Sequence, residues 1–270
     1  MTNEEAWQHR FGGIARLYGV DALNFFAKSR VAVIGIGGVG SWAVEALARS
    51  GVGQITLVDL DDICLTNVNR QLHAMDGHIG RAKIEAMAER VRAISSDCEV
   101  ITLPCFLNET TVGRILDHGF DGLIDAIDDA SHKALLAAEC LRRKIHLVTC
   151  GGAGGKRDAT RIRVSDLAQS GADPLLHAMR RAMRQHHGFP KTPRNTEPLP
   201  FGIEAVFSDE PPYYAQCDGS VSRQFPTDAQ GRLNCTTGFG SVSHLIASFG
   251  LIAVGRMLDY LTAQSAVGEK

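Results

Sequence analysis

The chain has 270 residues, of which 44% are hydrophobic and 21% are charged, and its formal net charge is −2. This composition is ordinary for a globular protein with a sizeable core, arranged as one large or two small domains. A net charge so close to zero excludes a global attraction to nucleic acid or to membranes, so any such contact has to come from a local patch.

The cysteines and the first residues indicate a cytoplasmic protein. Seven cysteines are spread along the chain, and no two of them have the C-x-x-C spacing of a tetrathiolate zinc site. Their odd number, with a polar start (MTNEEAWQHR) that lacks the apolar core of a signal peptide, predicts reduced thiols in the cytosol. Residues 238–258 approach the length of a membrane span, but His244 and several serines and glycines dilute their hydropathy. We expect a buried helix there and no stable membrane association.

Buried strands alternate with helices from residue 31 to residue 150. The expected strands are 31–35, 54–60, 98–106, 121–127 and 145–150. The expected helices follow the glycines near residue 42 and then occupy 80–95, 109–119 and 131–144. This alternation predicts an α/β fold, Rossmann-like and doubly wound, with a mainly parallel sheet between two layers of helices.

The alternation stops after residue 155, and the rest of the chain is expected to form an irregular C-terminal excursion. Residues 159–167 have the pattern of a strand, 173–187 that of a basic amphipathic helix, and 204–234 that of a flap or irregular lobe. One domain is the simplest interpretation. Its expected parts are an N-terminal arm (1–30), a nucleotide-binding core (31–155), a substrate-facing excursion (156–235) and a C-terminal helix (236–270).

A glycine-rich turn joins the first strand to the first helix. Gly35, Gly37 and Gly40 satisfy the G-x-G-x-x-G pattern, and Gly38 lies between them. Glycine permits a tight turn, close approach of a phosphate and close packing of the helix on the strand. Asp59 ends the next strand, where a carboxylate can accept hydrogen bonds from ribose hydroxyls. The pattern predicts an adenine nucleotide and leaves both NAD and ATP open.

Two cations further along distinguish ATP from NAD. Asn67, Asn69 and Arg70 come shortly after Asp59, and Lys83 begins a helix. Arginine forks onto phosphate oxygens and lysine supplies a point charge, which suits a triphosphate and has little use beside a neutral nicotinamide. Either cation alone is more often a surface charge. Their coincidence with the glycine turn favours ATP.

Carboxylates follow the fourth strand, at the edge of the sheet where ligands of open α/β folds bind. Asp128 is well placed to hold Mg²⁺ against phosphates. Asp129 is expected to cap the next helix, and Asp125, inside the strand, to be structural.

Together these motifs resemble those of the ubiquitin-activating-like adenylating enzymes, which include the enzymes that activate sulfur-carrier proteins. The shared order is G-x-G-G-x-G, D-x-D, N-x-N-R-Q, a lysine and Asp-Asp, and VFSDE at 206–210 fits a later pattern. The segments WQHRFGGIARLYG, TNVNRQLHA, LVTCGGAGG and CTTGFGS narrow the resemblance to the tRNA threonylcarbamoyladenosine dehydratase family, over nearly the whole chain. That family uses ATP to cyclise the threonylcarbamoyl group on the adenosine beside the anticodon.

The resemblance implies a role for each matching residue. Its implied nucleotide contacts are Gly35, Gly37, Gly38 and Gly40 along the nucleotide, Asp59 at the ribose, Asn69, Arg70 and Lys83 at the phosphates, and Asp128 at Mg²⁺. It also implies a homodimer in which one subunit lends an arginine to the triphosphate. Arg16 is the candidate for this catalytic arginine and Arg10 the runner-up, in cis or in trans. A cysteine desulfurase system is a family-level partner without a signature in these residues.

The thioester chemistry of the superfamily finds no support here. Its zinc-binding cysteines and an obvious transfer cysteine are absent from the sequence. Cys235, in NCTTGFG, is expected to be structural because buried cysteines are usually inert.

One segment concentrates positive charge in a chain that is otherwise nearly neutral. Its basic residues are Arg180, Arg181, Arg184, Lys191 and Arg194. Such residues suit sequence-tolerant phosphate contacts, although a solvated helix face explains them equally well. The resemblance favours the first interpretation, so tRNA carrying threonylcarbamoyladenosine is expected on the 156–235 excursion.

Three other functions fit less of the sequence. Adenylation of a ubiquitin-like sulfur carrier uses the same chemistry, but the missing zinc cysteines and the basic segment count against it. An NAD-dependent oxidoreductase has no use for the N-x-N-R-Q motif with Lys83. A non-catalytic nucleotide sensor or scaffold is disfavoured because Arg70, Lys83 and Asp128 are all present.

Overall fold

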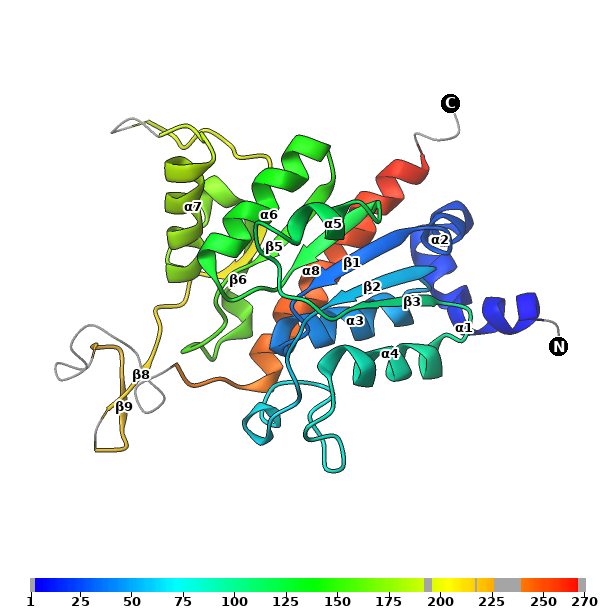
Figure 1. Cartoon of the computed structure of the whole chain (residues 1–270), viewed down its shortest axis with the longest axis horizontal. Helices are drawn as coiled ribbons and strands as arrows, with labels where there is room; N and C mark the ends of the chain where they lie inside the picture. The colour runs from blue at the N-terminus through cyan, green and yellow to red at the C-terminus, as the bar shows by residue number, and fades with distance from the viewer. Residues whose placement is uncertain (1–2, 192–195, 217, 226–238, 267–270) are drawn as a thin grey trace.

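The computed structural model describes residues 3–191, 196–216, 218–225 and 239–266. In these residues seven strands form one sheet with helices on both faces (Figure 1). The strands are β1 (Arg30–Ile34), β2 (Gln54–Val58), β3 (Glu99–Leu103), β4 (Gly122–Asp125), β5 (His146–Cys150), β6 (Ile162–Asp166) and β7 (Glu204–Ser208). Their order is β3-β2-β1-β4-β5-β7-β6, and only β6 runs antiparallel to its neighbour. The predicted Rossmann-like, mainly parallel sheet is confirmed.

The helices pack in two layers. They are α1 (Asn3–Tyr18), α2 (Val20–Phe26), α3 (Gly38–Arg49), α4 (Lys83–Ile94), α5 (Val112–Leu116), α6 (Ala130–Arg143), α7 (Pro174–His186) and α8 (Ser243–Ser265). Successive residues of β1 show why two layers are needed. Val31 and Val33 join the hydrophobic cluster on one face, and Ala32 and Ile34 join the cluster on the other. Side chains alternate along a strand, so an unbroken apolar run requires cover on both sides.

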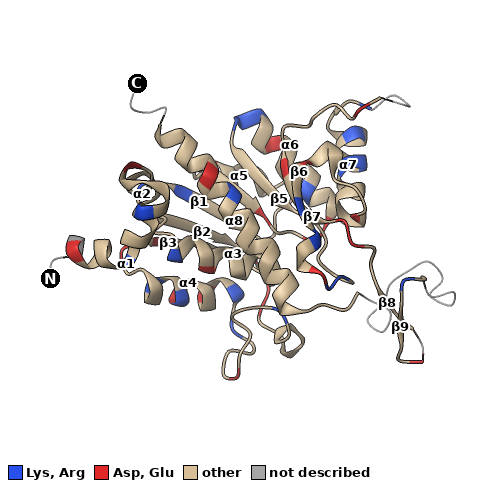
Figure 2. Cartoon of the chain, turned by 180° about the vertical axis from the view of Figure 1, so that it is seen from behind, with Lys and Arg blue, Asp and Glu red and all other residues tan. Residues whose placement is uncertain are grey.

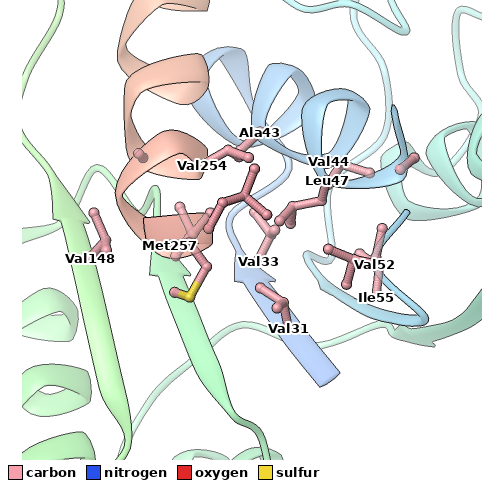
Figure 3. Packing of buried hydrophobic residues seen from close by; sticks show 14 of the residues in the cluster. Val31, Val33, Ala43, Val44, Leu47, Val52, Ile55, Val148, Val254 and Met257 are labelled. Atoms are coloured by element: carbon pink, nitrogen blue, oxygen red, sulfur yellow. The ribbon is translucent and has the colours of Figure 1, made fainter. Parts of the chain in front are cut away.

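Helix α8 forms much of the first layer together with α3. Figure 3 shows Val254 and Met257 of α8 close to Val33 of β1 and to Ala43 and Leu47 of α3. By length and composition alone α8 is apolar enough to cross a membrane. Its apolar side chains instead pack into the core, as predicted for this segment.

The crossing of α8 over α3 is close because Gly250 has no side chain. A Cβ atom at this position would lie 2.5 Å from the carbonyl oxygen of Val39 and 3.0 Å from the amide nitrogen of Ala43. The approach holds α8 against the first turns of α3, which directly follow the glycine-rich turn.

Helices α5, α6 and α7 cover the opposite face. Leu136 of α6 and Met179 and Met183 of α7 are fully buried in the second cluster. Helix α7 begins where the sequence provides both a cap and a proline. The side chain of Asp173 accepts a hydrogen bond from the amide of Leu176, and Pro174 occupies the first helical position, where no amide proton is needed.

The N-terminal segment, which was predicted as an arm over residues 1–30, is helical from Asn3. It forms α1 and α2, and Phe11, Leu23 and Phe26 are buried in the first hydrophobic cluster. Helix α2 packs against α8 of the same chain. These apolar residues belong to the core, which fixes the segment to its own subunit.

The excursion differs from the prediction. Residues 204–208 were expected in an irregular lobe, but they form β7, a buried strand that pairs with β5 and β6. The predicted boundary between the nucleotide-binding core and the excursion, at residue 155, therefore falls inside one continuous sheet, because β7 pairs with β5 and β6 continues the same sheet. The part that leaves the α/β body is a hairpin of β8 (Tyr214–Ala215) and β9 (Val221–Ser222), which projects in both Figure 1 and Figure 2.

Candidate active site

A pocket of about 820 Å³ opens at the carboxyl ends of the central strands. Its walls include Ile34 after β1, Asp59 after β2, Asp128 after β4 and residues 150–154 at the end of β5. Strand β1 lies between β2 and β4, so the chain leaves this edge in opposite directions on its two sides. Such a switch point is where open α/β sheets bind ligands.

The glycine turn forms the floor of the pocket. Gly35 has φ of +88°, and a Cβ atom on it would lie 2.9 Å from the carbonyl oxygen of Ala126. Gly35, Gly37 and Gly38 line the pocket. Gly40 has a different task, since a Cβ atom there would lie 1.8 Å from the carbonyl oxygen of Gly35. It lets α3 start directly on β1, as the sequence pattern requires.

Asp59 and Lys83 lie together on the β2 side of the pocket. The buried Asp59 carboxylate accepts hydrogen bonds from the amides of Ile36 (2.6 Å) and Asp61 (2.8 Å). The Lys83 Nζ atom lies 2.7 Å from Asp61 Oδ2 and 4.0 Å from Asp59 Oδ1. Two carboxylates therefore hold the ammonium group at the first turn of α4, facing the pocket.

Arg70 lines the pocket, and its guanidinium is oriented by its own loop. Nη1 donates to the carbonyl oxygen of Thr66 (2.8 Å) and to Asn69 Oδ1 (3.0 Å). Asn67, rather than Asn69, is the asparagine on the pocket wall. The side-chain amide of Asn69 donates to the carbonyl oxygen (3.0 Å) and the hydroxyl (3.1 Å) of Ser241, just before α8. Asn69 thus braces Arg70 from outside the pocket, and its predicted phosphate contact stays a prediction.

The three aspartates at the end of β4 and directly after it have different roles. Asp125 is fully buried and lies 3.0 Å from Lys133 Nζ and 2.7 Å from the hydroxyl of Thr149. Asp129 caps α6 by accepting the amides of Ser131 and His132, both at 2.9 Å. The structural role of Asp125 and the capping role of Asp129 are both as predicted.

Asp128 faces the pocket with its carboxylate exposed, and within the described residues it makes no ion pair. The same part of the chain contains no cluster of three or more His, Cys, Asp or Glu side chains able to enclose a metal ion. One carboxylate beside a phosphate site suits Mg²⁺, which takes one or two protein ligands and completes its shell with phosphate and water.

A glycine-rich wall, residues 151–154, closes the pocket after β5. Asp173 holds this wall, since Oδ2 accepts the amide of Gly152 at 2.9 Å and lies 3.4 Å from Lys156 Nζ. Lys156 also donates to the carbonyl oxygen of Ser208 at 3.0 Å. Both charged side chains are buried. No sequence motif predicts this pair, because a motif does not show that a lysine is buried.

Cys150, on the pocket wall, is not suited to nucleophilic catalysis. Burial raises the pKa of the Cys150 thiol to about 12, so it stays protonated at neutral pH. The five cysteines in the described part of the chain are free thiols. Cys235 lies outside that part.

Neither predicted N-terminal arginine lines the pocket of its own chain. Arg10 donates to the carbonyl oxygen of Ile94 at 3.2 Å, at the end of α4 opposite to Lys83. Arg16 is exposed in the last turn of α1. A contact of either with the triphosphate requires a second subunit and stays a prediction.

The basic residues of the excursion are not equivalent. Arg180 is half-buried, and its guanidinium donates to the backbone and hydroxyl oxygens of Ser170. Burial, reinforced by Arg184, lowers the pKa of Arg180. Arg184 donates to the carbonyl oxygen of Pro190 at 3.2 Å, whereas Arg181 and Lys191 are exposed. Arg194 lies outside the described residues. Arg180 thus supports the fold through these hydrogen bonds, and its predicted contact with nucleic acid stays a prediction.

A Rossmann-like sheet whose carboxyl edge gathers a glycine turn, Arg70, Lys83 and Asp128 defines a nucleotide-binding α/β protein. Comparison with known proteins narrows this class. Residues 13–267 match the ThiF family. The tRNA threonylcarbamoyladenosine dehydratase of Escherichia coli is 46% identical over 97% of both chains, and that of Haemophilus influenzae is 44% identical over 97% of this chain and 96% of its own length.

Solved structures agree with this similarity. The E. coli dehydratase in complex with ATP superposes with a TM-score of 0.84 at 41% identity, covering 98% of this chain and 99% of that chain. The molybdopterin-synthase adenylyltransferase of E. coli is more distant, with 27% identity over 55% of this chain. This protein therefore belongs to the ThiF family, within its tRNA threonylcarbamoyladenosine dehydratase branch.

Proposed function

We propose that this protein catalyses the ATP-dependent dehydration of threonylcarbamoyladenosine in tRNA, closing the threonylcarbamoyl group into a ring. The observation that carries the proposal is one pocket lined by the glycine turn, Arg70, Lys83 and Asp128, in a chain similar along its length to dehydratases that bind ATP and AMP. Adenylation of a sulfur-carrier protein is not favoured, because the adenylyltransferases resemble only part of the chain.

The chemistry begins with a carboxylate that cannot react directly, because its leaving group would be oxide. A carboxylate oxygen of the threonyl group attacks the α-phosphorus of ATP, and the bond from that phosphorus to pyrophosphate breaks. The product is an acyl-adenylate. A group of the same modified base then attacks the acyl carbon and loses a proton, while AMP leaves with the former carboxylate oxygen. One water is lost in total, and the intramolecular step benefits from a high effective concentration.

The protein's part is to position the phosphates and to balance their charge. Hydrogen bonds to its own loop hold Arg70, and the Asp61 carboxylate holds Lys83, so both meet the developing negative charge without reorganising. The Asp59 carboxylate, fixed by two amides, is the proposed ribose contact. Asp128 is the proposed ligand of Mg²⁺, which when bound supplies further charge neutralisation at the phosphates.

The remaining partners are also proposals. We expect a cytoplasmic homodimer in which Arg16, or else Arg10, reaches the triphosphate of the other subunit. The exposed location of Arg16 supports this assignment. A cysteine desulfurase or sulfur acceptor is proposed from the family resemblance alone.

The decisive experiment measures ATP consumption with purified protein, Mg²⁺ and tRNA carrying threonylcarbamoyladenosine, followed by mass analysis of the nucleoside. Release of AMP and pyrophosphate with loss of one water from the base supports the proposal. No reaction with this tRNA, together with pyrophosphate exchange in the presence of a sulfur-carrier protein, would replace it with the adenylyltransferase activity.

A further inference from the structure

Two arginines lie against the Tyr213 ring beside the β8–β9 hairpin: Arg157 belongs to the loop after β5, and Arg223 directly follows β9. Arg157 lies 4.2 Å and Arg223 lies 4.9 Å from the centre of the Tyr213 ring. Arg223 also donates to the Tyr213 hydroxyl at 3.2 Å. In the part of the chain that the structure describes, neither guanidinium forms an ion pair, and both side chains are exposed. One tyrosine thus fixes two solvent-facing cations near each other.

The neighbouring arginines differ from these two because they form ion pairs. Arg161 lies 2.6 Å and Arg163 lies 3.2 Å from the carboxylate of Asp209. Glu210 Oε2 accepts the backbone amides of Arg157 and Asp158 at 2.8 and 2.9 Å, so this carboxylate is directed at the backbone and not at the Arg157 guanidinium. Arg157 and Arg223 thus differ from Arg161 and Arg163 in having no ion pair within the described residues, while the nearby exposed carboxylates Asp158 and Asp218 accept hydrogen bonds from Thr160 and Ser220.

Aromatic side chains adjoin the two arginines. The rings of Phe225 and Phe239 lie 5.2 and 5.3 Å from the ring of Tyr214. Phe225 is 42% exposed and Phe239 is 36% exposed. Exposed rings beside unpaired arginines match the chemistry of unstacked nucleic-acid bases, which stack on aromatic or guanidinium planes while their phosphates meet positive charge.

This surface is continuous with the wall of the nucleotide pocket. The Tyr213 amide donates to the carbonyl oxygen of Gly155 at 2.6 Å, and the Gly155 amide donates to that of Gly240 at 2.8 Å. Arg157 follows the wall residue Gly154 by three positions, a span of at most about 11 Å. A nucleotide loop seated on the hairpin can therefore deliver one flipped base to the pocket.

Resting on the proposed function, we propose that Arg157, Tyr213, Tyr214, Arg223, Phe225 and Phe239 form the docking surface for the single-stranded loop of the tRNA. The arginines contact loop phosphates, and Tyr214 and Phe225 stack on unpaired bases. Exposed charges on α7, such as Arg181, contribute only peripheral contacts. None of these six residues belongs to the basic segment predicted to contact tRNA, which begins at Arg180.

The test measures binding of a fluorescent anticodon stem–loop RNA to the full-length protein over a range of salt concentrations. Replacing both Arg157 and Arg223 with Glu is expected to weaken binding at least tenfold at low salt and to reduce the slope of log K against log salt by roughly one per arginine. Phe225→Ala is expected to weaken binding roughly 5- to 150-fold. Tyr213→Phe keeps the platform and is expected to bind almost as the wild type, whereas Tyr213→Ala releases the arginines and binds weakly.

Two controls make the outcome specific. Arg92→Glu reverses an exposed charge in the last turn of α4, remote from the pocket, and is expected to leave RNA binding unchanged. ATP binding, measured by calorimetry, is expected to be normal in every hairpin variant, which also reports that the variants fold. Hairpin variants that bind RNA with the affinity and salt slope of Arg92→Glu would overturn the docking surface while leaving the proposed function intact. A wild-type protein that neither binds the RNA nor dehydrates the modified base would overturn the proposed function itself.

Discussion

The nucleotide pocket and helix α7 both contain arginines that the sequence assigns to phosphate, yet the two regions use them differently. In the pocket, Arg70 is braced by Thr66 and Asn69 and still lines an open cavity. On α7, the half-buried Arg180 donates hydrogen bonds to the backbone and hydroxyl oxygens of Ser170. The same residue type, chosen on chemical grounds, is a ligand candidate in one region and an internal support in the other.

The difference lies in what fixes each residue's location. Arg70 and Lys83 follow a strand and a glycine turn whose geometry leads to one edge of the sheet, so their position in the sequence determines where they lie. The α7 arginines occur on a helix whose orientation depends on packing against α6. Charge density alone does not determine which face of such a helix is exposed.

The largest effect is expected from breaking the buried ion pair between Lys133 and Asp125 at the end of β4. Lys133→Met leaves the buried Asp125 carboxylate without its cation, and we expect the free energy of unfolding to fall by about 3–5 kcal/mol in chemical denaturation. Adding Asp125→Asn to this variant removes the unpaired charge and is expected to recover part of the loss. If Lys133→Met were as stable as the wild type, the ion pair would have no part in holding the β4 edge.

The next prediction compares the adjacent carboxylates Asp128 and Asp129, which both line the pocket. Asp128→Ala is expected to reduce Mg²⁺-dependent pyrophosphate release about 10²- to 10³-fold with little change in stability, because it removes an exposed ligand. Asp129→Ala is expected to cost about 0.5–2 kcal/mol of stability through loss of the α6 cap, with a far smaller effect on rate. Equal rates in the two variants would contradict the metal role of Asp128.

A third experiment tests the contrast on α7 itself. Arg180→Ala is expected to lower the free energy of unfolding by about 1–3 kcal/mol, because the buried Ser170 carbonyl loses its donor, and to leave tRNA affinity unchanged at temperatures where it is folded. Arg181→Glu is expected to leave stability unchanged and to weaken tRNA binding slightly. A stable Arg180→Ala variant with reduced tRNA affinity would restore the direct phosphate contact.

The smallest expected effect concerns pH. His73 is fully buried, and its Nε2–H donates to the carbonyl oxygen of Ile36 in the glycine turn (2.9 Å). Desolvation lowers its pKa, so between the ordinary value near 6.5 and the folded value the unfolded chain binds more protons. Stability is therefore present above about pH 6.5 and is lost as the pH falls below it. His73→Gln is expected to flatten this pH dependence in thermal unfolding, whereas His177→Gln on the exposed face of α7 is not.

The sequence predicts the fold well where periodicity and turns agree. The five strands from residue 30 to 150 lie where the apolar runs predict them, with ends within a few residues. Strand β7 was missed because only ten residues lie between Pro200 and Pro211, so its apolar run is too short to stand out. No helix was assigned in the N-terminal segment, where two adjacent glycines, Gly12 and Gly13, interrupt the helical pattern of α1.

The sequence predicts which loops form the site, but it does not predict which side chain of a loop lines the pocket. The N-x-N-R-Q motif correctly leads to the pocket, but spacing alone does not distinguish the wall residue Asn67 from Asn69, which bonds to Ser241. The Lys156–Asp173 pair joins segments that are far apart before folding, so only the tertiary structure reveals it.

The contact of Gly250 with the first turn of α3 has a consequence for biosynthesis. Helix α3 leaves the ribosome long before α8, so the nascent α/β layer exposes the apolar surface that α8 later covers. Completion of this core depends on contacts between residues more than two hundred positions apart, such as Gly250 and Val39, which slows folding and leaves the intermediate prone to aggregation. We therefore expect the newly made chain to need chaperone protection until α8 docks, and a polypeptide ending before residue 243 to accumulate in inclusion bodies.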